Sequence, residues 1–213
     1  KIKLMDNINK GMLIVISSPS GAGKTSICKK LLEIDDKIQP SISVTTREPR
    51  KNEINGIDYI FTTIEDFKKK ISNDEFLEYA DVFNNKYGTL ISSTKLLSDK
   101  GYDVLFDIDW QGTQQLSQVE ENILTIFILP PSKEEIEKRL KKRETENSKN
   151  SNIVKDRMLK FEDELSHWKE YDYVVTNDNF DNCVLEITNI INVERIKRAN
   201  KKSIITKIRD LKD

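Results

Sequence analysis

Residues 12–26 read MLIVISSPSGAGKTS, a short run of apolar and β-branched residues followed by a glycine-containing loop. The run predicts a buried strand, because continuous apolar stretches of this length are typical of parallel sheets. The loop fits the pattern G-x-x-x-x-G-K-[ST], except that Ser18 stands where the first glycine is usual. In such loops backbone N–H groups and a helix N-terminus bind phosphate. The stretch therefore predicts a phosphate-binding turn between strand and helix.

The chemistry of phosphate binding gives a role to each loop residue. Glycine is needed where φ is positive or the ligand approaches closely, and Gly21 and Gly23 supply it inside the loop. Lys24 would reach the β/γ-phosphates, and the Thr25 hydroxyl would bind Mg²⁺. The alternative is a strand-to-helix turn that binds nothing. The candidate ATP-binding residues of the loop are Ser20, Gly21, Ala22, Gly23, Lys24, Thr25 and Ser26.

Composition excludes several classes of protein. The 35 Lys and Arg residues nearly cancel the 36 Asp and Glu residues, so no overall field attracts nucleic acid or an anionic membrane. Cys28 and Cys183 lie far apart in the sequence, which argues for a reducing compartment and against a disulfide scaffold. The longest apolar run, residues 12–16, is too short to span a membrane. We therefore expect a soluble cytoplasmic protein with no nucleic-acid or membrane partner.

Strand and helix patterns alternate along the chain, which predicts an α/β fold with a parallel sheet covered on both faces. Shorter strand patterns interrupt the alternation between residues 57 and 91 and suggest an inserted antiparallel lobe. The polar tract 144–152 predicts a mobile loop. The expected strands are 12–17, 41–45, 57–61, 76–83, 87–91, 102–108, 123–129 and 171–176, and the expected helices are 23–34, 64–72, 92–100, 111–119, 132–143, 153–168 and one from 180.

A second phosphate-binding pattern lies in residues 43–61, SVTTREPRKNEINGIDYIF. Arg47 and Arg50 flank Glu48-Pro49, and guanidinium groups match phosphate oxygens in bidentate geometry. Ser43 and Tyr59 add nearby hydroxyl donors. The segment can therefore hold the phosphate of an acceptor nucleotide, or it can be a solvated basic loop.

The order of the motifs resembles one family, the guanylate kinases. The phosphate loop is followed by TTREPR, NGIDYIF, EFLEYADVFNNKYGT, LFDIDWQG and ILPPS, and the match covers about residues 11–195. Bacterial members of the family also lack the first glycine of the loop. The resemblance implies Mg²⁺-dependent transfer of the γ-phosphoryl group of ATP to GMP, giving ADP and GDP.

The resemblance also implies an organisation within a single domain. A P-loop parallel-sheet core flanked by helices would carry a small mixed α/β lobe that binds GMP and a helical lid. The expected core comprises residues 1–42, 102–134 and 161–213, the lobe residues 43–101, and the lid residues 135–160.

Glu78 matches the family's guanine-reading carboxylate. Guanine presents N1–H and the exocyclic amine as adjacent donors, whereas adenine N1 is an acceptor that a carboxylate repels. Thr89 and Asp109 match further contacts to the base. The cradle for the GMP phosphate matches Ser43, Arg47, Arg50, Tyr59 and Tyr87. Without the resemblance, Glu78 reads as a solvent-facing strand residue, Thr89 as an ordinary strand or turn residue, and the two tyrosines as core aromatics.

Asp107 and Asp109 end the apolar run YDVLFDIDW, at the edge of a parallel sheet where ligands bind. Asp107 could orient the waters of Mg²⁺, although Asp107 and Asp109 could instead cap the next helix. The resemblance also implies catalytic arginines, Arg139, Arg143 and Arg157, in a lid over the ATP phosphates, although the family's usual G-R-G is Lys142-Arg143-Glu144 here. Asn177 matches the loop that contacts adenine.

Two rival functions remain open at this stage. One is a non-catalytic guanylate-kinase-like module that binds a phosphorylated protein. Such modules have degraded phosphate loops, whereas this chain keeps Lys24 and Thr25. The other is a kinase for a different nucleoside monophosphate.

Overall fold

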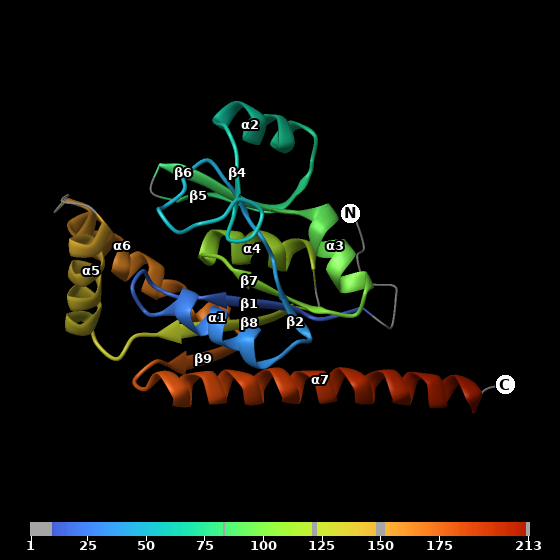
Figure 1. The fold of residues 1–213 in the computed structure, drawn as a ribbon. Helices are drawn as coiled ribbons and strands as arrows, with labels where there is room; N and C mark the ends of the chain where they lie inside the picture. The colour runs from blue at the N-terminus through green and yellow to red at the C-terminus, as the bar shows by residue number, and fades with distance from the viewer. Residues whose placement is uncertain (1–9, 83, 121–122, 148–151, 212–213) are drawn as a thin grey trace. The chain divides into compact units, whose positions relative to one another are not determined.

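The computed structural model describes residues 10–82, 84–120, 123–147 and 152–211. In chain order the elements are β1 Leu13–Ser17, α1 Lys24–Ile34, β2 Ile38–Pro40, β3 Val44–Thr45, β4 Ile60–Phe61, α2 Ile64–Ser72, β5 Phe76–Val82, β6 Asn85–Leu90, α3 Ile91–Asp99, β7 Asp103–Asp107, α4 Trp110–Val119, β8 Ile123–Leu129, α5 Lys133–Asn147, α6 Asn152–Ser166, the 3-10 helix His167–Glu170, β9 Tyr173–Thr176 and α7 Phe180–Asp210 (Figure 1). None of the described helices has both the length and the apolar character of a membrane span.

The predicted parallel sheet is confirmed. Five strands follow the order β2-β7-β1-β8-β9, and the registers of β1 with β7, β2 with β7, and β8 with β9 are all parallel. All five residues of β1 are buried, as their apolar character predicts. This α/β architecture brings the carboxyl ends of β1 and β7 to the same edge, where the functional segments begin.

The chain divides into two compact units, Lys1–Ser17 with Asp35–Thr125, and Ser18–Ile34 with Ile126–Asp213. The first unit contains β1, β2 and β7, a second sheet, and helices α2 to α4. Its hydrophobic core comprises Leu13, Val15, Leu77, Val104, Phe106, Ile108 and Leu116. The second unit contains the phosphate loop, α1, β9 and helices α5 to α7.

The second sheet of the first unit has the order β4-β3-β6-β5. Strand β6 pairs antiparallel with β5 and β3, as expected, whereas β3 and β4 pair in parallel. Helix α2 lies beside this sheet (Figure 1), where Phe67 is fully buried and stacks on Phe76 at 4.5 Å between ring centroids. Thr63 begins α2 by accepting a hydrogen bond from the Asp66 N–H.

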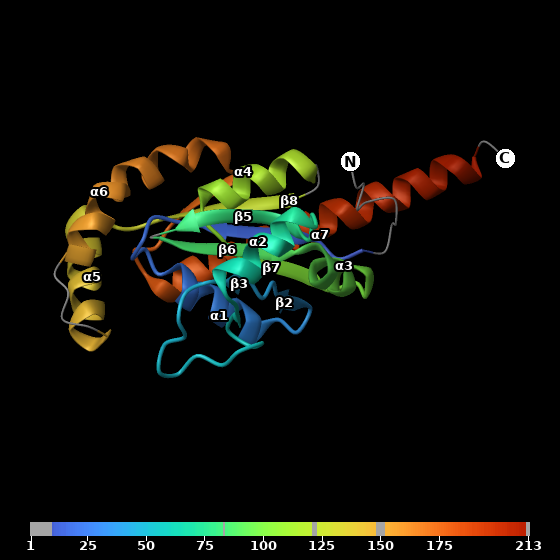
Figure 2. The ribbon, with the colours of Figure 1, turned by 90° about the horizontal axis from the view of Figure 1, so that it is seen from above.

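In the second unit, α5 and α6 lie side by side in both views (Figures 1 and 2). Their contact is a small apolar cluster of Ile136, Leu140 and Phe161, against which Met158 and Leu165 pack. This helix pair therefore has a hydrophobic core of its own.

Several sequence expectations about local structure were wrong. The strand expected at 41–45 forms only at Val44–Thr45, and the strand expected at 57–61 forms only at Ile60–Phe61. Strand β2, at Ile38–Pro40, was not expected. Gly56, with a φ of 83°, lies in a turn that ends before β4. The loop expected at 144–152 is helical up to Asn147 and again from Asn152. Glu and Lys are good helix formers, so polarity alone did not indicate a loop.

Candidate active site

The phosphate loop has the backbone that its sequence predicts. Gly21 and Gly23 have φ values of 91° and 99°, which residues with a Cβ rarely adopt. Helix α1 begins directly after them, since the N–H groups of Ser26 and Ile27 both donate to the Gly23 carbonyl. Lys24 and Thr25 are therefore the first two helical residues, at a helix N-terminus suited to anions.

Side chains from distant parts of the second unit hold this loop. The Ser20 N–H donates to Glu164 Oε2 at 2.8 Å, and Asn177 Nδ2 donates to the Ala22 carbonyl at 2.8 Å. Asn177 is only 5% exposed, and a Cβ on Gly23 would lie 2.7 Å from its Nδ2. The predicted contact of Asn177 with adenine stays a prediction, but its side chain supports the phosphate loop.

The predicted lid arginines are only partly described. Arg139 lies on α5, and its Nε donates to Glu135 Oε1 at 2.9 Å. A Cβ on Gly23 would lie 4.0 Å from Arg139 Nη1, so this arginine is near the phosphate loop. Arg143 belongs to α5 and Arg157 to α6, but their side chains lie outside the described residues.

Asp107 and Asp109 have different surroundings. Asp107 is half-buried at the end of β7, in register with Ile16 of β1. Asp109 caps α4: its Oδ1 accepts from the Gly112 N–H and its Oδ2 from Gln111 Nε2, both at 3.1 Å. The capping alternative is therefore confirmed for Asp109, and its contact with a base stays a prediction.

A divalent cation fits the acid and hydroxyl groups that are present. Within the described ranges no group of three or more His, Cys, Asp and Glu side chains is suited to a metal ion. Mg²⁺ does not need one, because it usually keeps several waters and takes one or two protein ligands plus substrate phosphates. Thr25 is exposed and Asp107 is half-buried, so each can offer an oxygen atom to an ion that needs so few protein ligands.

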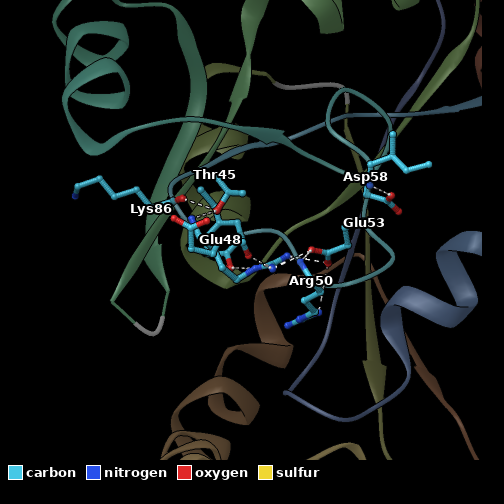
Figure 3. A network of polar contacts seen from close by, with 9 residues as sticks. Thr45, Glu48, Arg50, Glu53, Asp58 and Lys86 are labelled. Carbon is cyan, nitrogen blue, oxygen red and sulfur yellow. Dashed lines mark hydrogen bonds and ion pairs between the residues drawn. The ribbon is translucent and has the colours of Figure 1, made fainter. Parts of the chain in front are cut away.

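In the first unit the two predicted arginines share a carboxylate, Glu53. Arg47 binds it in bidentate fashion, with both N–O distances at 2.9 Å. The Arg50 guanidinium lies 3.6 Å from Glu53 Oε1, while the Arg50 N–H donates to Oε2 at 2.7 Å. Figure 3 shows Glu48, Arg50 and Glu53 together in this network. Arg47 is therefore part of an ordered ion-pair network, whereas Arg50 is exposed at its edge, and phosphate binding by the segment stays a prediction.

Burial and pairing act in opposite directions on this pair. Burial alone lowers the pKa of the Arg47 guanidinium, but hydrogen bonds to Glu53 and Tyr87 outweigh it and leave that pKa raised. Burial alone raises the pKa of Glu53, but the hydrogen bonds from Arg47 and the Arg50 N–H leave it lowered. Both groups therefore stay charged at neutral pH.

Replacing Glu53 with glutamine is expected to cost about 1–3 kcal/mol of unfolding free energy at pH 7, because Arg47 loses its bidentate partner. The folded-state pKa of Glu53 is below the ordinary value of 4.5. Its stabilising contribution is therefore present above that value and is lost as pH falls through the lowered pKa. Urea unfolding of both proteins between pH 7 and pH 3 measures this difference, which should shrink at the acidic end.

Glu65→Gln, an exposed position on α2, is the matched control for Glu53→Gln. If the difference in unfolding free energy between wild type and Glu53→Gln stays constant down to pH 3, the ion pair of Glu53 with Arg47 is contradicted.

Aromatic and hydroxyl groups surround Arg47. The Tyr59 and Tyr87 rings meet edge to face at 6.0 Å, and the guanidinium carbon of Arg47 lies 5.2 Å from the Tyr59 ring centroid. Arg47 Nε also donates to the Tyr87 hydroxyl at 3.2 Å. Ser43 is half-buried immediately before β3. The structure thus brings Arg47, Tyr59 and Tyr87 together around one guanidinium.

Glu78 is buried in the structure, at 3% exposure, which excludes the alternative of a solvent-facing strand residue. It lies on β5 directly opposite Thr89 of β6, which is fully buried and within 3.2 Å of the Ser41 hydroxyl. A Cβ on Gly112 would lie 2.6 Å from Glu78 Oε2, so a larger residue at this position would make the carboxylate shift.

Helix α4 also fixes the strand at Glu78. The Gln115 side chain accepts from the Tyr79 N–H at 3.0 Å and donates to the Tyr79 carbonyl at 2.6 Å. Glu78 is therefore followed on β5 by Tyr79, whose backbone N–H and carbonyl are both hydrogen-bonded to α4. Such anchoring keeps a recognition group in a defined place.

Sequence reasoning missed four residues with clear structural roles, Glu53, Gly112, Gln115 and Glu164. Glu53 follows Arg47 and Arg50 closely in the sequence, and an acidic residue at this spacing could have predicted the ion pair. Glu164 is 144 residues from Ser20, and Gln115 is 36 residues from Tyr79. Nothing local in the sequence indicates these two pairings.

Comparison with known proteins agrees with this geometry. The guanylate kinase family model matches residues 10–194. Guanylate kinases from Zymomonas mobilis and Rickettsia prowazekii are 47% and 49% identical to this chain, over 92% and 89% of it and 90% and 94% of their own lengths. The crystal structure of guanylate kinase from Anaplasma phagocytophilum has a TM-score of 0.72 at 37% identity and covers 87% of both chains. This chain belongs to the guanylate kinase family.

Proposed function

We propose that this protein transfers the γ-phosphoryl group of ATP to GMP in a Mg²⁺-dependent reaction, giving ADP and GDP. One observation carries the proposal: a single chain has a phosphate loop that ends in Lys24-Thr25 and, separately, an ordered arginine cradle near a buried carboxylate. A phosphotransferase acting on a nucleotide needs both, one phosphate site for the donor and one for the acceptor.

The donor is held by the phosphate loop. Backbone N–H groups and the N-terminus of α1 bind the phosphates of ATP, and the Lys24 ammonium neutralises the transferring group. Thr25 and Asp107 are the residues that would hold Mg²⁺, Asp107 through water, and the ion would supply charge neutralisation between phosphate oxygens. Arg139 is near enough to the loop to add a further cation.

The acceptor is recognised through its phosphate and its base. Arg47 and Arg50, with the Ser43, Tyr59 and Tyr87 hydroxyls, bind the GMP phosphate. The buried Glu78 carboxylate accepts from guanine N1–H and from the exocyclic amine, and Thr89 contacts another edge of the base. A buried site of this kind rejects a base that leaves its polar groups unpaired by several powers of ten.

The reaction needs no protein general base. The phosphate of GMP is already anionic and attacks directly, and the transition state is loose, with charge spread over equatorial oxygens. The protein's contribution is therefore positioning, charge neutralisation and the exclusion of water that would hydrolyse ATP. The three candidate lid arginines, Arg139, Arg143 and Arg157, would serve this charge neutralisation.

The deciding experiment measures ADP release with ATP, Mg²⁺ and each of GMP, AMP, CMP and UMP as acceptor. We expect turnover with GMP that exceeds turnover with the others by several powers of ten. Preference for another monophosphate would favour the rival kinase. Absence of turnover together with tight binding of a phosphopeptide would favour the non-catalytic module.

Replacing Arg50 with alanine is expected to weaken GMP binding about ten- to hundredfold, because one charge-assisted hydrogen bond to the acceptor phosphate is lost. The Arg50 side chain is 44% exposed, so the fold should tolerate the change. Calorimetric titration with GMP and, separately, with Mg-ATP measures the effect.

Lys51→Ala removes an exposed neighbouring cation and is the control for Arg50→Ala. The affinity for Mg-ATP should not change in either variant. An unchanged GMP dissociation constant in Arg50→Ala would remove Arg50 from the cradle.

We also propose a cytoplasmic location. Its support is that ATP and GMP are available there and that Cys28 and Cys183 are both buried free thiols.

A further inference from the structure

A carboxylate of helix α6 accepts a hydrogen bond from the backbone of the phosphate loop. Glu164 Oε2 accepts from the Ser20 N–H at 2.8 Å, across 144 residues of sequence. Glu164 is half-buried, whereas its neighbours Glu162 and Asp163 on the same helix are exposed. The side chain of Glu164 is thus directed to the loop while the adjacent acids face solvent.

A carboxylate at this place is electrostatically unfavourable for a triphosphate site. Two like charges a few ångströms apart repel, and the repulsion grows as water is excluded. A glutamate that only added charge there would weaken ATP binding. The hydrogen bond from the Ser20 N–H offers a benefit that can offset this repulsion, because it fixes the orientation of the Ser20 peptide at the start of the turn.

Other contacts fix the rest of the loop from the same unit. Asn177, at the end of β9, holds the Ala22 carbonyl. Ile136 and Leu140 of α5 are buried, and a Cβ on Gly21 would lie 3.5 Å from Ile136 and 3.3 Å from Leu140. The loop therefore rests on α5, α6 and the end of β9, each through a different contact.

We propose that Glu164 is a positioning residue, which ties the shape of the phosphate loop to helix α6 through its hydrogen bond with Ser20. The inference rests on the proposed function, since the loop that it positions is taken to bind ATP. Helix α6 packs on α5 through their shared apolar core, and Glu164 reaches the Ser20 peptide from this helix. ATP then meets a loop that is already in its binding shape, which lowers the cost of ordering it.

Two substitutions separate the hydrogen bond from the charge. Glu164→Gln keeps a carbonyl oxygen that can accept from Ser20 and removes the negative charge, whereas Glu164→Ala removes both. We expect Glu164→Ala to raise the Mg-ATP dissociation constant about tenfold, because ATP binding must then order the Ser20 peptide that the hydrogen bond holds in wild type. Glu164→Gln should bind Mg-ATP at least as tightly as wild type, and GMP affinity should be unchanged in both.

Glu162→Ala is the matched control, because it removes a carboxylate two residues away whose side chain is 78% exposed. Hydrogen exchange of the Ser20 amide gives a readout that needs no nucleotide. Exchange should accelerate in Glu164→Ala and stay close to wild type in Glu164→Gln and Glu162→Ala.

Three results would overturn the proposal. One is wild-type Mg-ATP affinity in Glu164→Ala, and another is an equal loss in the alanine and glutamine variants. The third is a parallel loss of GMP affinity, which would indicate general unfolding. If wild type itself fails to bind Mg-ATP, the proposed function fails, and exchange at Ser20 still decides whether Glu164 holds the loop.

Discussion

Replacing Lys24 with alanine is expected to lower the turnover number about a hundredfold or more. The ammonium group acts where charge develops on the transferring phosphoryl group, and removing one such preorganised donor typically costs this much in kcat. Lys24 begins α1 directly after Gly23, and the positive φ values of Gly21 and Gly23 belong to the loop backbone, which the substitution does not alter. The loop should therefore keep its shape in the variant.

Single-turnover and steady-state assays with saturating ATP and GMP measure the loss from Lys24→Ala. Lys30→Ala on the same helix removes a lysine whose partner is the exposed Glu33, and it should leave turnover unchanged. Near-normal turnover in Lys24→Ala would refute the role of Lys24 in the chemical step. A rise in the ATP KM with kcat unchanged would mean that Lys24 binds the ground state and the transition state equally.

The second large effect is expected at Glu78. Glu78→Gln replaces one carboxylate oxygen with an NH₂ group, which would face a guanine donor, so kcat/KM for GMP should fall about a hundredfold or more. The same NH₂ can donate to adenine N1, so the preference for GMP over AMP should shrink. The change is nearly isosteric at a position that is 3% exposed, so packing against Gly112 is retained.

The preference of Glu78→Gln is measured as the ratio of kcat/KM values for GMP and AMP. Glu75→Gln is the matched control, because it makes the same chemical change just before β5, at a carboxylate that pairs with Lys70. An intact preference in Glu78→Gln would mean that guanine is read by other groups.

The main features of the fold could be predicted from the sequence because they depend on local patterns. The apolar run before the phosphate loop is β1, and the run YDVLFDI is β7, which pairs with it in parallel. The positive φ values of Gly21 and Gly23 follow from the steric demands of the loop alone. In these cases the local preference and the final environment agree.

Long-range partners could not be predicted in this way. The sequence predicts Arg47 and Arg50 as phosphate ligands. Their shared partner Glu53 is found only in the structure, where the segment folds back on itself. The burial of Glu78 depends on a glycine of α4 that the chain reaches 34 residues later. Without the family resemblance, Glu78 was expected to face solvent, and this was wrong because tertiary contacts decide which face of a strand is covered.

The ion pair of Arg47 with Glu53 has a consequence for selectivity among anions. The guanidinium is neutralised before any ligand arrives, so a small anion gains little by exchanging with a carboxylate already held at 2.9 Å. Inorganic phosphate has no nucleobase to make further contacts, so it competes with Glu53 for the Arg47 guanidinium through its own charge alone. A nucleotide that also engaged Glu78 would gain a second, independent set of contacts, so we expect the protein to bind GMP in preference to free phosphate.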